Sequence, residues 1–102
     1  TGLQACALPI CGQDLFFDQT TKCAECHSGQ TTTDGKMHDV GTSDRKLNTP
    51  SLQGLYYTAP YLHDGSAGNL FDVLEHTAET MGKTNQLTDE QKGDLVAFLL
   101  TL

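Results

Sequence analysis

The sequence predicts a single, mainly helical and loop-rich domain. Two stretches near the C-terminus begin with helix-capping residues and continue with apolar residues at helical spacing, and a short apolar cluster precedes a cysteine motif. No segment shows the alternation of apolar and polar residues that is typical of a strand. A chain of 102 residues has the size of one domain. We therefore expect one domain over residues 1–102, with residues 1–11 as an N-terminal extension.

The first expected helix lies just before the cysteine motif. An apolar cluster at residues 15–17 marks this short helix, and a break at residues 20–21 ends it. A helical turn then carries residues 23–27. The stretch 28–69 is rich in Gly, Thr, Ser and Asp without a sustained period, so we expect loops there, with one short helical turn at residues 51–55.

Two more helices are expected towards the C-terminus. Asn69 can cap a helix over residues 70–78, because its side-chain oxygen can accept a backbone N–H of the first turn. Thr88, followed three residues later by Gln91, forms a capping box. One face of this final helix is apolar at positions i, i+3, i+4 and i+7, which are Leu95, Phe98, Leu99 and Leu102.

Charge and hydropathy exclude two classes of partner. The chain has 13 acidic and six basic residues, a net charge of −7, and no basic patch, so we expect no nucleic-acid partner. No stretch approaches the roughly 20 apolar residues needed to span a bilayer. Because the chain starts at Thr1 without an initiating Met, we expect a mature or excised form.

Residues 22–29 read KCAECHSG, which is the most informative stretch of the chain. Two cysteines two residues apart, followed at once by a histidine, are typical of covalent attachment of a c-type haem. Cys23 and Cys26 would form the two thioether bonds, and His27 would bind the iron as the proximal ligand. We therefore predict one haem c.

Two other chemistries use a Cys-x-x-Cys motif. A redox dithiol follows a strand in a βαβ unit, which this sequence does not offer, and Glu25 would oppose thiolate formation. A structural zinc site needs four ligands, and Cys6 and Cys11 could complete a set, although their spacing is loose. Neither alternative explains why His27 adjoins the second cysteine, so haem attachment is the favoured interpretation.

The two remaining cysteines suggest a disulfide. Cys6 and Cys11 flank a short segment with a proline, and we expect a Cys6–Cys11 bridge. Haem c is attached outside the cytoplasm, and disulfides persist in the same environment. We therefore expect a periplasmic or otherwise extracytoplasmic protein of bacterial type.

Beyond the cysteine motif, the stretches NTPSL, PYLHDGS and LTDEQKGDLVAFLLTL carry a family likeness. Over residues 12–102 the chain resembles the C-terminal haem domain of the bacterial di-haem cytochrome c peroxidase and MauG superfamily. The resemblance implies a class I cytochrome c-like fold, in which the N- and C-terminal helices cross beside the haem. It implies that Gly12, Phe16 and Phe98 meet at this crossing, with Gly12 allowing close backbone approach.

The family pattern is broken at the position of the second axial ligand. The resemblance implies a Met or Tyr at the position of Thr77, which is not a plausible iron ligand. Met81 lies nearby on a glycine-containing loop, so we predict it as the distal ligand, with His76 or an open iron as the alternatives. On the proximal side, the carbonyl of Pro50 is expected to accept the N–H of His27.

These residues predict a monohaem c-type cytochrome that transfers single electrons to redox partner proteins through a His/Met-ligated iron. No catalytic residues are expected. Two alternatives remain open. One is a haem domain of a larger peroxidase or MauG-like enzyme, which would act with a second haem domain in peroxide reduction or as its electron donor. The other is a ligand-binding haem sensor.

Overall fold

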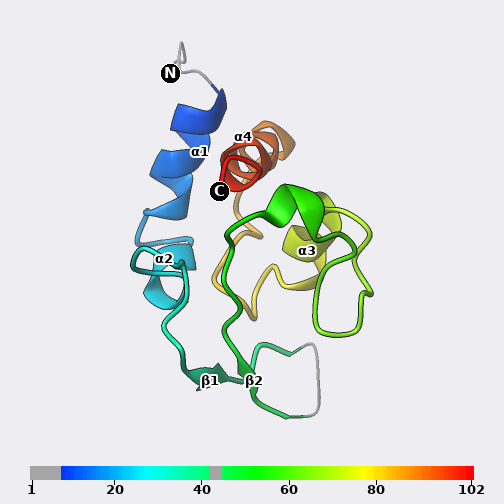
Figure 1. Cartoon of the computed structure of the whole chain (residues 1–102). Helices are drawn as coiled ribbons and strands as arrows, with labels where there is room; N and C mark the ends of the chain where they lie inside the picture. Colours follow the sequence, from blue (N-terminus) through cyan, green and yellow to red (C-terminus); the bar gives the residue numbers. More distant parts are fainter. Residues whose placement is uncertain (1–7, 42–44) are drawn as a thin grey trace.

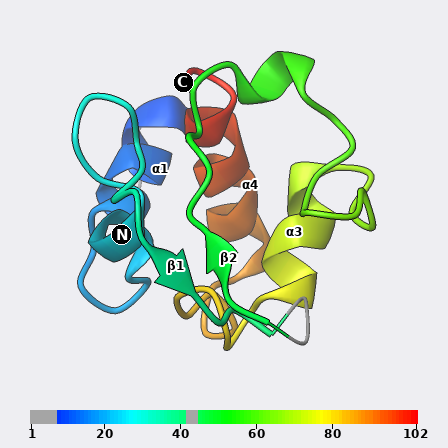
Figure 2. The ribbon, with the colours of Figure 1, turned by 60° about the horizontal axis from the view of Figure 1, so that its bottom comes forward.

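Short helices carry most of the regular structure in the computed structural model, which describes residues 8–41 and 45–102 (Figure 1). In chain order the elements are α1 (Leu8–Phe16), α2 (Cys23–Cys26), β1 (Met37–His38), β2 (Leu47–Asn48), the 3-10 helix η1 (Leu55–Tyr57), α3 (Leu70–His76) and α4 (Asp89–Leu99). Helix α4 packs against both α1 and α3 (Figure 2). The mainly helical, loop-rich fold is as predicted.

The crossing of α1 and α4 depends on a glycine. A Cβ atom at Gly12 would lie 2.0 Å from the carbonyl oxygen of Asp94 and 2.7 Å from the Cβ of Phe98, so only glycine fits there. One turn further along α1, the ring of Phe16 packs against that of Phe98 with their centroids 5.3 Å apart. The expected meeting of Gly12, Phe16 and Phe98 is confirmed.

Helices α3 and α4 begin with the predicted caps. The Asn69 side chain accepts the backbone N–H of Asp72 at 2.9 Å. In the capping box, the Thr88 hydroxyl accepts the N–H of Gln91 at 3.1 Å, and the Gln91 side chain accepts the N–H of Thr88 at 2.9 Å. Helix α3 ends at His76, two residues earlier than predicted, because the chain turns tightly after it.

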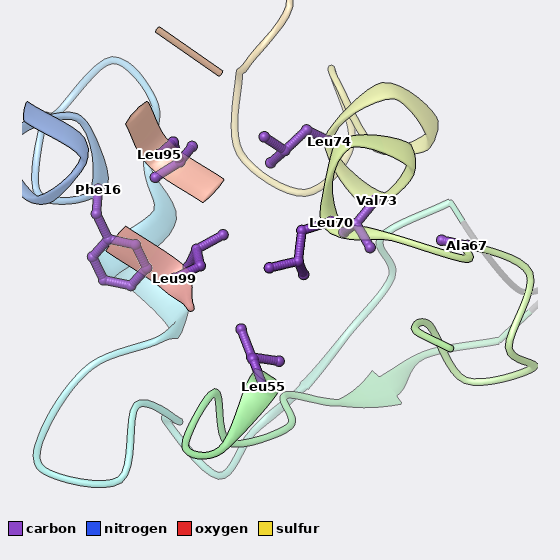
Figure 3. Packing of buried hydrophobic residues seen from close by; sticks show 8 residues of the cluster. All are labelled: Phe16, Leu55, Ala67, Leu70, Val73, Leu74, Leu95 and Leu99. Atoms are coloured by element: carbon purple, nitrogen blue, oxygen red, sulfur yellow. The ribbon is translucent and has the colours of Figure 1, made fainter. Parts of the chain in front are cut away.

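A small apolar core lies between these helices. Its buried members are Phe16, Leu55, Ala67, Leu70, Val73, Leu74, Leu95 and Leu99. Leu55, Leu70 and Leu99 come from different elements and point toward one another (Figure 3). Leu95 and Leu99 bury the face of α4 that the sequence predicted. An ion pair between the buried Lys92 and the exposed Glu75 joins α4 to α3, with the Lys92 ammonium 2.8 Å from a Glu75 carboxylate oxygen.

A two-stranded antiparallel pairing of β1 and β2 was not predicted. Met37 lies opposite Asn48 and His38 opposite Leu47. The arrows of β1 and β2 lie side by side in Figure 2. Strands of two residues are too short to show an alternating pattern. The short helical turn expected at residues 51–55 was placed too early, because the 3-10 helix begins at Leu55.

The start of the chain bears on two predictions. Helix α1 begins at Leu8, inside the segment predicted as an extension. Cys6 lies outside the described residues, so the Cys6–Cys11 bridge stays a prediction. Within the described ranges, no helix has the length and apolarity needed to cross a membrane.

Candidate haem-attachment site

The cysteine motif forms a single helical turn, α2, below the end of α1 (Figure 1). Lys22, just before it, has a left-handed backbone with φ of 62°. The buried hydroxyl of Thr21 donates a hydrogen bond to the carbonyl of Leu15 at 2.5 Å and so ties this turn to α1. Cys23 and Cys26 are half-buried and not disulfide-bonded. Both thiols are therefore free for thioether formation.

The surroundings of the two thiols oppose ionisation. Burial raises the pKa of Cys23. Burial also raises the pKa of Cys26, and the carboxylates of Asp34 and Glu25 raise it further. Reactive dithiols have lowered pKa values, because the thiolate is the nucleophile. The raised pKa values of both thiols thus argue against a redox dithiol, in the direction expected from Glu25.

His27 is buried and held in one orientation. Its Nδ1 lies 3.0 Å from the carbonyl oxygen of Thr32. A carbonyl can only accept, so Nδ1 carries the proton and the lone pair is on Nε2. Burial lowers the pKa of His27, and the carbonyls of Thr32 and Pro50 act in the opposite direction. A ring whose lone pair is on Nε2 fits a ligand of haem iron.

Thr32 was missed by the sequence analysis. It has a left-handed backbone with φ of 56°, which costs about 1–3 kcal/mol in a residue other than glycine. Its hydroxyl accepts the N–H of Leu52 at 2.7 Å and donates to the carbonyl of Thr31 at 2.6 Å. The Ser51 hydroxyl donates to the same Thr31 carbonyl at 2.5 Å. These bonds join the loop after His27 to the segment after β2.

A second group of polar side chains lies beside Cys26. Nε2 of His38 is 3.7 Å from the sulfur of Cys26 and 2.7 Å from a carboxylate oxygen of Asp34. The backbone N–H of Lys36 and the His38 ring, in that order, contribute to lowering the pKa of Asp34 to about 2. The three ligand atoms are close enough to share a metal ion. Of the zinc ligands considered from the sequence, this group contains Cys26 alone, and thioether formation would remove its thiolate.

The loop that carries Met81 lies against the start of the cysteine motif. The Met81 side chain is half-buried against the core. A Cβ atom on Gly82, which has φ of +80°, would lie 2.3 Å from the carbonyl oxygen of Thr21. The N–H of Lys83 donates to that carbonyl at 2.9 Å, and the N–H of Met81 donates to the carbonyl of Thr77 at 3.1 Å. The loop is thus fixed at both ends.

Thr77, at the position of the family's ligand, and His76, the alternative to Met81, differ in exposure. The hydroxyl of Thr77 is buried and donates to the carbonyl of Val73 at 2.7 Å, so it is already used within the protein. His76 is exposed at the end of α3. It lines a surface hollow of about 330 Å³ together with Gly41, Leu62 and Ser66.

The chain is similar in sequence to known c-type haem proteins. The profile of the Cytochrome c family matches residues 11–102. The chain is 36% identical to the methylamine utilization protein MauG of Methylorubrum extorquens over 85% of its length, which is 32% of that protein. It is 29% identical to the cytochrome c551 peroxidase of Nitrosomonas europaea over 89% of its length, which is 33% of that protein. The chain thus spans about a third of the length of these relatives.

Solved structures show the same fold. A chain of hydrazine synthase from Kuenenia stuttgartiensis superposes with a TM-score of 0.83 at 24% identity, covering 99% of this chain and 47% of that one. A MauG-like protein associated with microbial copper homeostasis superposes with a TM-score of 0.82, also at 24% identity, over 97% of this chain and 47% of that one. The chain belongs to the cytochrome c family and is a c-type haem domain related to those of MauG and the di-haem cytochrome c peroxidases.

Proposed function

We propose that this chain is an electron-transferring haem c domain. Cys23 and Cys26 would hold the macrocycle covalently, and His27 and Met81 would occupy the two axial positions. The observation that carries the proposal is the orientation of His27. Its Nδ1 donates a hydrogen bond to the Thr32 carbonyl, and the residue directly follows the turn with the two unbridged thiols. Haem bound in this way supplies reversible one-electron oxidation and reduction of its iron.

Each part of the chain has a distinct task in this proposal. The thiols on α2 fix the position of the macrocycle, and the backbone carbonyl fixes the plane and tautomer of the His27 ring. The leucines of the core exclude water from the interior. Met81 offers a soft thioether on a loop that is bonded to the start of the cysteine motif, which supports it over the exposed His76.

We further propose that the domain works with a second haem domain in a larger oxidoreductase of the MauG or peroxidase type, outside the cytoplasm. The relatives support this role, because the chain matches only about a third of each. The 102 residues contain one Cys-x-x-Cys-His motif. An independent single-electron carrier is the second candidate, and its support is the complete α1–α4 crossing within this chain.

The test is the optical spectrum of the haem-loaded, oxidised protein at neutral pH, compared with Met81→Ala and His76→Ala. The wild type is expected to be low-spin with the weak long-wavelength sulfur-to-iron charge-transfer band. Met81→Ala is expected to lose this band, and His76→Ala to keep it. A wild type without the band, whose spectrum changes in His76→Ala, would assign the distal position to His76 instead.

Hydrogen peroxide separates electron transfer from chemistry at this iron. With both axial positions filled by the protein, the oxidised spectrum is expected to stay unchanged on adding peroxide, and the reduced form to be reoxidised slowly. A high-spin wild type that reacts rapidly with peroxide would instead indicate an open iron and an enzymatic site. Displacement of Met81 by low concentrations of CO would favour the sensor interpretation.

A further inference from the structure

The proximal histidine bonds to a carbonyl that the sequence analysis did not identify. Nδ1 of His27 lies 3.0 Å from the carbonyl oxygen of Thr32, five residues along the chain. Pro50, the partner expected from the sequence, also acts on the ring through its carbonyl. The main chain at Thr32 is therefore part of the immediate environment of His27.

The backbone of Thr32 is in a conformation that threonine rarely adopts. Its φ of 56° is in the left-handed region, where a β-branched side chain is disfavoured. Such a conformation persists only where the surroundings impose it, and it is concentrated at functional sites. Here the surroundings are two hydrogen bonds of its own hydroxyl, which accepts the N–H of Leu52 at 2.7 Å and donates to the carbonyl of Thr31 at 2.6 Å.

Hydrogen bonds of the neighbouring residues join the same two segments. The Ser51 hydroxyl donates to the Thr31 carbonyl at 2.5 Å, and the Gln53 side-chain amide donates to the carbonyl of Gln30 at 3.0 Å. The loop that follows His27 is thus bonded along its length to the segment that follows β2. The hydroxyl of Thr32 links these two segments at the residue whose carbonyl faces the histidine.

We propose that Thr32 is the positioning residue of the proximal ligand: its hydroxyl clamps a strained backbone so that its carbonyl accepts the Nδ1 proton of His27. This inference rests on the proposed function, because it assumes that Nε2 of His27 binds haem iron. A firmly held acceptor makes the imidazole a stronger donor through Nε2. A stronger donor favours Fe(III) over Fe(II), so the clamp lowers the reduction potential.

Three haem-loaded variants test the role of the hydroxyl. Thr32→Val keeps the shape of the side chain and removes the hydroxyl. Thr32→Gly also removes it but accepts a positive φ without strain, so this variant folds even if the valine variant does not. Thr32→Ser keeps the hydroxyl and serves as the conservative rescue. Thr101→Val is the matched control, because its hydroxyl donates to the Phe98 carbonyl at the end of α4 and not to a segment that faces His27.

Two quantities are measured in each variant: the midpoint potential and, by NMR of the reduced protein, the solvent exchange of the His27 Nδ1 proton. Thr32→Val and Thr32→Gly are expected to shift the Fe(III)/Fe(II) equilibrium about tenfold towards Fe(II), a rise of about 59 mV for a one-electron couple, and to speed exchange at least tenfold. Thr32→Ser and Thr101→Val are expected to keep both wild-type values.

The outcomes distinguish this inference from the proposed function. A folded Thr32→Gly protein with the wild-type potential and slow proton exchange would overturn the positioning role while leaving the haem domain intact. A serine variant that shifts as much as the valine variant would overturn the role of the hydroxyl. If the wild type itself carries no haem on the cysteine motif, or if His27→Ala leaves its low-spin spectrum unchanged, the proposed function fails instead.

Discussion

At the scale of single residues, Gly82 allows the loop that carries Met81 to approach the backbone of Thr21 closely. In Gly82→Ala the new Cβ would meet the carbonyl oxygen of Thr21 at 2.3 Å, and the residue would also be strained at φ of +80°. We expect the loop to move, the sulfur-to-iron band to weaken or vanish, and the free energy of unfolding to fall by more than the roughly 1–2 kcal/mol of the backbone strain alone. Optical spectroscopy and urea denaturation measure these effects.

Gly35 provides the matched control for this substitution. It also has a positive φ, of +67°, but a Cβ there would meet nothing within 4 Å. Gly35→Ala is therefore expected to cost only the strain of roughly 1–2 kcal/mol and to leave the optical band unchanged. Equal losses of the band in both variants would show that Gly82 has no special contact with the start of the cysteine motif.

Asp34 gives the stability a defined dependence on pH. Hydrogen bonds, first from the N–H of Lys36, lower its pKa from 3.8 to about 2. A carboxyl whose pKa is lowered on folding contributes stability above its unfolded value, and this contribution is lost as the pH falls through the folded value. The free energy of unfolding should therefore fall between pH 3.8 and about 2, and less steeply in Asp34→Asn. Parallel curves for the two proteins would contradict this.

Residues of the site differ in how far the sequence could predict them. The haem-attachment motif lies within five consecutive residues, so the chemistry of Cys23, Cys26 and His27 can be recognised without a structure. Thr32 could not be recognised, because threonine disfavours a left-handed backbone and the cause of its conformation is a contact with Leu52, distant in the sequence. His38 was likewise not connected to Cys26, since a two-residue strand positions it.

At the scale of helices, two glycine-to-alanine substitutions are expected to change the free energy of unfolding in opposite directions. The first is at the α1–α4 crossing. Gly12→Ala would place a Cβ 2.0 Å from the carbonyl oxygen of Asp94, so the helices must separate. We expect the free energy of unfolding to fall by about 2–3 kcal/mol, in the range of overpacked cores. Chemical denaturation of the haem-loaded protein measures it.

Gly93, in the middle of α4, provides the second substitution, which is the control for Gly12→Ala. A Cβ there would lie 3.7 Å from the ring of Phe71, which is an ordinary contact distance. Because alanine favours a helix interior over glycine, Gly93→Ala should raise the free energy of unfolding by about 0.5–1 kcal/mol. If both substitutions destabilise the protein equally, the close approach of the helices at Gly12 is not the cause of the destabilisation in Gly12→Ala.

The helices themselves were largely predictable, because their start signals are local. The caps at Asn69 and Thr88 each depend on residues within one turn, and both are present as expected. The end of α3 at His76 depends on the turn that leads towards Met81. Contacts of this kind, between segments outside the helix, leave no periodic signal in the sequence. The pairing of β1 with β2 also depends on such a contact.

At the scale of the whole molecule, the protein core is small. Among the described residues, eight hydrophobic side chains are buried, for a chain of 102 residues. Domains of this size bury a limited share of their surface, and bound haem would add apolar contacts to the interior. We expect the haem-free double variant Cys23→Ala/Cys26→Ala to bind a hydrophobic dye and to lose its sharp unfolding transition.

The single variant Cys23→Ala is the control, because Cys26 can still form one thioether bond and His27 is retained. It is expected to keep haem and a cooperative transition by circular dichroism. A haem-free double variant that unfolds as sharply, and at the same temperature, as the haem-loaded wild type would show that the protein core suffices by itself.

The hydrogen bond between His27 and Thr32 also bears on the order of assembly. It joins residues only five positions apart, so closing this loop costs little chain entropy. The α1–α4 crossing instead joins segments far apart in the sequence, so closing it costs more chain entropy. The attachment segment can therefore take its final shape while the terminal helices are still separate, and a nascent chain can present both thiols and the histidine together before the rest of the domain closes over them.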